Sequence, residues 1–148
     1  LAVLAWALQL HELPAYDELI IAPDLYYSMS LFDADGAKQY LAHPNLRSSE
    51  ELEWMGVHQL MAHWRLRDFS LRPQAMDFVE FSKKSWIGEF DLAGYRLVDN
   101  DLAIGDVAIS DAEPDEISRV NSIAMERHLA INWFLGESER YSETDTST

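Results

Sequence analysis

The stretch of sequence that decides the fold reads Glu126-Arg127-His128-Leu129-Ala130-Ile131-Asn132-Trp133. It lies within a predicted helix that begins near Ser110 or Asp111 and ends before Gly136, about 20 residues and roughly 30 Å long. Apolar residues lie on both sides of this helix, which is typical of a helix at the centre of its domain. Leu129 and Trp133 lie on one side. The stripe on the other side consists of Ile117, Val120, Ala124, Ile131 and Leu135.

Four polar residues of this helix are the candidate site residues, namely Glu126, Arg127, His128 and Asn132. A rotation of about 100° per residue places Arg127 and His128 on the two flanks of the apolar stripe, whereas Glu126 points away from it. An unpaired buried charge costs several kcal/mol. The sequence therefore predicts that these side chains are held in polar networks.

Three interpretations of these four residues stay open. The favoured one is a satisfied buried network that fixes how the helix packs. The second is a catalytic or ligand-binding site, which requires a cavity beside His128 and Asn132, since these two lie four residues apart and share a face. The third is simple exposure to solvent.

The next helix toward the N-terminus has a clear start. Ser48 and Glu51 have the spacing of a capping box, in which the hydroxyl and the carboxylate each bond a backbone amide of the other residue. A helix is therefore predicted over residues 49–68, with Arg65 and Arg67 near its negative end. Its predicted buried face consists of Val57, Leu60, Met61 and Trp64.

Shorter helices are predicted on either side of that one. Residues 1–13 are apolar nearly all round and end at Pro14, and residues 25–31 follow the helix-starting Pro23. Residues 33–36, Asp-Ala-Asp-Gly, read as a turn. A further helix is predicted to open at Pro73 and to stop near Lys84, with Met76, Val79 and Trp86 on one side.

A β ribbon is predicted between the last two helices. Two short apolar runs, 102–104 and 107–109, are separated by Gly105-Asp106, which is typical of a two-residue hairpin. A second turn at 99–101 returns residues 96–98 to the first run. The predicted fold class is therefore mainly α with a small antiparallel β ribbon.

The domain organisation follows from these elements. We expect a single helical domain over residues 1–136 and an acidic polar tail over 137–148, loosely ordered unless it docks. Because the chain starts inside a predicted helix, without an initiating Met, we expect further sequence to precede Leu1.

Composition excludes several classes of function. The net charge of −15 repels phosphate backbones, so no nucleic-acid partner is expected, and a basic protein is the partner that such a surface suits. The sequence holds no cysteine, which removes disulfides and thiolate chemistry and makes a cytoplasmic location the default. No apolar run approaches the roughly 20 residues of a membrane span.

No cofactor or metal site is expected. His58 and His63 lie five residues apart, so they do not form the same-face pair that zinc helices use. The Asp33–Gly36 segment lacks the spacing of a calcium loop. The sequence contains neither a glycine-rich phosphate loop nor a Gly-x-Ser-x-Gly motif.

The decisive helix also resembles a known family. Residues 122–133, with Glu-Arg-His followed shortly by Asn-Trp, are similar to the signature helix of the bacterial domain of unknown function 4272 family (DUF4272). Supporting similarities lie at Trp6–Leu10, Leu13-Pro14, residues 101–104 and residues 141–143, and a departure lies at Ala15, where an aromatic or apolar residue is expected. The resemblance covers nearly the whole chain and implies a shared fold, but it implies no reaction.

The function that the sequence favours is a non-enzymatic protein-interaction domain. Its acidic surface would engage a basic protein, as an inhibitor or immunity-type factor does. The alternatives are an enzyme or small-molecule binder with a polar pocket around Glu126, Arg127 and His128, and a structural module of a longer chain. The sequence does not determine the oligomeric state.

Overall fold

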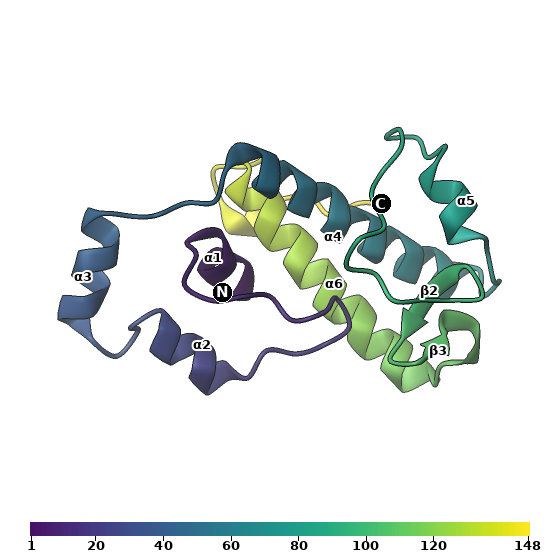
Figure 1. Ribbon diagram of the computed structural model, residues 1–148, viewed down its shortest axis with the longest axis horizontal. Coiled ribbons are helices and arrows are strands. Elements are labelled where there is room, and N and C mark those ends of the chain that lie inside the picture. The colour runs from purple at the N-terminus through teal and green to yellow at the C-terminus, as the bar shows by residue number, and fades with distance from the viewer.

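Two long helices, α4 (Ser49–Leu71) and α6 (Pro114–Phe134), pack side by side and form the frame of the molecule (Figure 1). The computed structural model describes all residues from 1 to 148. The shorter helices are α1 (Ala2–Ala7), α2 (Ala22–Ser28), α3 (Ala34–Ala42) and α5 (Phe78–Ser82). With the three-stranded sheet described below, these helices confirm the predicted fold class.

Hydrogen bonds between neighbouring residues define the start of α4 and the end of α6. The predicted capping box of α4 is confirmed, because Ser48 Oγ accepts from the Glu51 amide and Glu51 Oε2 accepts from the Ser48 amide. At the end of α6, Gly136 has a φ of +89°, and the Glu137 amide donates back to the Asn132 carbonyl at 3.2 Å. This is the left-handed stop that the glycine predicts.

The sheet is the predicted ribbon, with β1 (Leu97–Val98), β2 (Asp101–Ile104) and β3 (Val107–Ala108) in antiparallel order β1-β2-β3. Leu97 pairs with Leu102, and Ala103 pairs with Ala108. Its turns use left-handed residues, Asp99 and Asn100 in the first turn and Gly105 in the second.

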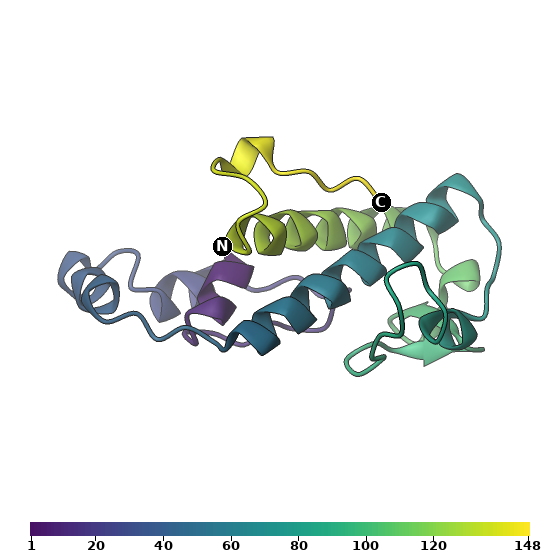
Figure 2. The same cartoon turned by 90° about the horizontal axis from the view of Figure 1, so that it is seen from above.

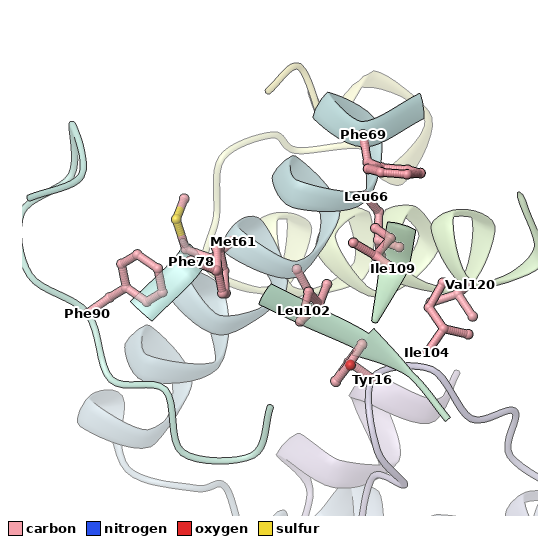
Figure 3. Close-up of a cluster of buried hydrophobic side chains, with 12 residues drawn as sticks. Tyr16, Met61, Leu66, Phe69, Phe78, Phe90, Leu102, Ile104, Ile109 and Val120 are labelled. Carbon is pink, nitrogen blue, oxygen red and sulfur yellow. The ribbon is translucent and has the colours of Figure 1, made fainter. Parts of the chain in front are cut away.

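The larger core lies where α4 and α6 meet the sheet and α5 (Figure 3). Figure 3 shows that its side chains come from all of these elements and that Tyr16 joins them from the N-terminal segment. A smaller core holds α1 against α4 and α6. Its buried members are Val3, Trp6, Ala7, Met55, Ala130 and Ile131.

Two predictions for the N-terminal part were wrong. The first helix ends at Ala7, before residue 13, because Gln9 turns left-handed and the Leu10 amide donates to the Ala5 carbonyl. The Asp33–Gly36 segment is the start of α3 and not a separate turn, because Asp33 accepts from the Asp35 amide and caps the helix. Figures 1 and 2 show α2 and α3 extending away from the frame, and α3 buries none of its residues.

Two further predictions need correction. The helix expected at Pro73 begins only at Phe78, because Asp77 caps it by accepting from the Glu80 amide. The buried face of α4 was also assigned wrongly in part, since Met61 is buried but Val57 is 37% exposed. The face turned toward the core instead includes four polar side chains, namely His58, Gln59, His63 and Arg65.

Candidate functional site

A groove of about 700 Å³ lies between α4, α6 and the C-terminal segment. Figure 2 shows this segment running back alongside the two helices after the end of α6. The residues that line the groove are Glu53, Gly56, Val57, Leu60, Trp64, Trp86, His128, Asn132, Leu135, Glu137, Asp145, Ser147 and Thr148. The acidic tail is therefore docked along the frame and forms one wall of the groove.

The groove has apolar walls, and the carboxylates in its lining give it charge of one sign, negative. Trp64 stacks on Phe81 with ring centroids 4.4 Å apart, and Trp86 packs against Trp64 edge-on at 5.1 Å. Trp86 is nevertheless 58% exposed, so it offers free aromatic surface to a ligand. The acidic residues that line the groove are Glu53, Glu137 and Asp145, and neither a lysine nor an arginine lines it.

A polar network stands in the wall formed by α6. His128 Nδ1 lies 3.1 Å from His63 Nδ1, and Asn132 Nδ2 lies 3.0 Å from His128 Nε2. Asn132 Nδ2 also donates to the carbonyl of Asp145 at 3.2 Å. Since Nδ2 only donates, His128 Nε2 accepts and its Nδ1 carries the proton, so His63 Nδ1 accepts. Both nitrogens of His128 are therefore engaged within the protein.

The candidate residues separate into three environments. His128 and Asn132 share the groove wall, as their spacing predicts. Arg127 is buried on the other flank and donates to three backbone carbonyls, those of Pro14, Ala15 and Glu18. Glu126 is exposed, with the Tyr141 hydroxyl 3.5 Å from its carboxylate. The four residues consequently do not form one cluster.

Sequence reasoning missed the partners that make these networks. His63 reaches His128 across 65 positions, and it lies on the α4 face that the apolar spacing did not identify. Trp86 was expected on one side of a helix with Met76 and Val79, whereas it lies beyond α5 and lines the groove. Gly56 was a usable signal, because a Cβ there would lie 3.0 Å from Leu135 Cδ1 at the groove floor.

The buried histidines are held neutral. Burial lowers the pKa of His128 to about 4; nearby His63 also lowers it, and Asp145 opposes the shift. Burial and Arg127 lower the pKa of His58 to about 4, against the opposing effect of Asp91. Burial and Arg67 lower the pKa of His63.

These pKa shifts predict weaker folding in acid. Below the unfolded pKa of about 6.5, the unfolded chain binds protons that the folded chain does not, so stability falls as the pH drops from 6.5 toward 4. We expect His128→Gln to reduce the loss between pH 7 and pH 5 by on the order of 1 kcal/mol, measured by urea unfolding. His43→Gln, at an exposed position, is the matched control. An equal pH dependence in wild type and His128→Gln would contradict the assignment.

Comparison with known proteins does not place the chain in a group: no family model, curated protein or solved structure matches it. The resemblance of residues 122–133 to the domain of unknown function 4272 family therefore stays a prediction. No three His, Asp or Glu side chains lie close enough together to hold a metal ion. None of the helices combines the length and the apolar character that crossing a membrane requires.

Proposed function

We propose that the chain is a binding domain whose groove between α4 and α6 holds a basic segment of a partner protein. The observation that carries this proposal is the groove lining, in which apolar side chains are combined with charged groups of one sign, the carboxylates of Glu53, Glu137 and Asp145. A lysine- or arginine-containing segment with one or two apolar side chains would complement both features. The net charge of −15 would add attraction over a longer range.

The geometry of the candidate residues supports binding over catalysis. Proton transfer to a ligand needs a ring nitrogen within reach of it, and both nitrogens of His128 already bond protein atoms. The guanidinium of Arg127 donates to three backbone carbonyls in residues 14–18, so it is not free to contact a ligand. An inhibitor or immunity-type role in the cytoplasm fits such a domain, since it acts by occupying a basic surface.

The test uses an amphipathic peptide of lysine and leucine, with binding followed by calorimetry at low and high salt. We expect the double variant Glu53→Gln/Glu137→Gln to weaken binding about fivefold, because it removes two exposed carboxylates from the groove. Trp86→Ala should weaken binding at both salt concentrations, since its contribution is apolar.

The matched control is Glu113→Gln/Asp115→Asn, which changes the net charge equally at the far end of α6. Its exposed carboxylates lie outside the groove lining, so we expect less than a twofold effect. Equal weakening by the two double variants would show that only bulk charge matters and would refute a groove site.

A small-molecule site is the second candidate. The cavity volume lies in the range of ligand pockets, roughly 300–1,000 Å³, and the side-chain oxygen of Asn132 would supply a polar contact. A small ligand that raises the melting temperature of wild type but not of Asn132→Leu would favour this function over peptide binding.

A further inference from the structure

A second, smaller hollow of about 340 Å³ lies next to the groove, and the two share Glu53 and Val57 on α4. It is formed by the first turns of α4 and by the segment 89–91 that follows α5. Its lining residues are Glu50, Glu53, Trp54, Val57, His58, Glu89, Phe90 and Asp91. The proposed function makes no use of this hollow.

Three aromatic rings form a continuous stack at its wall. Trp54 and His58 stack with ring centroids 4.8 Å apart and an angle of 18° between their planes. His58 and Tyr95 stack at 4.1 Å and 22°. The stack ends in Trp54, which remains 39% exposed, so a further planar group can be added to it.

Four carboxylates surround this stack without a cation. Glu50, Glu53, Glu89 and Asp91 are all exposed, and none of them takes part in an ion pair. Like charges gathered at one place repel one another unless a cation joins them. The hollow therefore favours a positively charged ligand.

A buried donor-acceptor group in the same wall also lacks a partner. His58 is only 7% exposed, and its Nδ1 is buried without a hydrogen bond. A buried nitrogen of this kind destabilises the fold when it is left unpaired. This nitrogen is a further polar group in the lining of the hollow that no protein atom satisfies.

The chain already contains an occupied site of the same composition. The guanidinium of Arg47 lies over the Trp6 ring, 4.6 Å from its centroid, and its nitrogens donate to Glu12 at 2.6 Å and to Glu51 at 3.0 Å. An indole face with carboxylates at its edge thus holds a planar cation by stacking and by in-plane hydrogen bonds. Trp54 with its carboxylates offers the same groups, and no lysine or arginine of the chain lines this hollow.

We propose that the hollow at Trp54 is a guanidinium site, which takes an arginine side chain of the same basic segment that the groove binds. This inference rests on the proposed function for the identity of the ligand, but the site itself can be tested without it. An arginine at Trp54 and an apolar residue beside Trp86 would then define the sequence that the partner must carry. Glu53, which lines both hollows, would lie between the two anchors.

The test follows the indole N–H resonances of the five tryptophans by NMR while N-acetyl-arginine-amide is added to the full chain. We expect the Trp54 resonance to shift and to saturate at millimolar probe, while that of Trp86 stays unchanged. N-acetyl-citrulline-amide, the uncharged isostere, should bind at least tenfold more weakly, and the lysine analogue should bind severalfold more weakly because it cannot stack as a plane.

Two variants separate the site from the fold and from the groove. Glu50→Gln/Glu89→Gln changes only exposed side chains and should weaken the arginine probe several-fold, whereas Glu113→Gln/Asp115→Asn should not. Trp86→Ala should leave the arginine probe unaffected even though it weakens the lysine-leucine peptide.

Equal binding of the citrulline and arginine probes, or the absence of a Trp54 shift at tens of millimolar, would overturn the guanidinium site. Peptide binding that depends on Trp86 would survive that result, so the two proposals fail separately.

Discussion

Asp101→Ala is expected to lower the free energy of unfolding by about 3–5 kcal/mol, because it removes the closer counter-charge of a fully buried arginine and leaves only the 3.4 Å contact with Asp68. Arg65 is 0% exposed, and its Nε and Nη2 donate to the two carboxylate oxygens of Asp101 at 2.8 and 2.5 Å. The same carboxylate accepts from the amides of Leu102 and Met76, so it joins α4, β2 and the segment before α5. Urea unfolding followed by circular dichroism measures the loss.

Two comparisons make this prediction specific. Arg72→Ala breaks the exposed pair with Asp68, and since Arg72 is 76% exposed, we expect a change below about 0.5 kcal/mol. The apolar double exchange Arg65→Met/Asp101→Leu should be more stable than Asp101→Ala, because it leaves no buried charge behind. A loss below 1 kcal/mol in Asp101→Ala would contradict the role assigned to the pair.

Arg127→Met is expected to cost about 3 kcal/mol, since a methionine fills similar volume but donates no hydrogen bond. The wild-type side chain donates to the carbonyls of Pro14, Ala15 and Glu18 at 3.1, 3.0 and 2.7 Å. Losing these bonds removes the side-chain donor from the part-buried carbonyls of Pro14 and Glu18, whereas the Ala15 carbonyl keeps its bond to the Glu18 amide. Urea unfolding measures the cost.

The same exchange should loosen the hairpin at a distance. The segment 14–18 carries Asp17, which accepts from the Gly105 amide at 2.8 Å, and Tyr16, whose hydroxyl donates to the carbonyl of Ala103. We expect the Gly105 amide to exchange its hydrogen faster in Arg127→Met than in wild type.

Glu126→Gln is the neighbouring control, because Glu126 is exposed and lies outside this contact. Unchanged hydrogen exchange at Gly105 in Arg127→Met would show that Arg127 does not hold the segment in place.

Local sequence signals predicted the elements of this fold well where the signal lies within a few residues. The capping box at Ser48 and Glu51, the hairpin at Gly105 and the helix stop at Gly136 each have a local signature in the sequence, and the structure contains all three. Predictions were poorest where local and distant contacts compete. The first helix ends at Ala7, and the carbonyl freed there accepts from the Arg47 amide, 40 positions along the chain.

The candidate site shows the same limit. The helical projection separated Glu126 from Arg127 and His128, and the structure places the three in different surroundings. The projection did not identify the contact partners of these three residues. The position of a side chain around its helix defines a direction, but it does not define the residue that lies in that direction. The groove itself draws on residues from 53 to 148 and has no local signature.

The sequence by itself determined the central helix, its two apolar sides and the polar residues between them, since helical period and charge are properties of neighbouring residues. Only the tertiary structure decided that Arg127 fastens the segment 14–18 while His128 and Asn132 stand in the wall of a groove. The physical reason is that a buried polar group takes whichever donor or acceptor the packing brings within about 3 Å of it. That neighbour is set by how α4, α6 and the tail pack together.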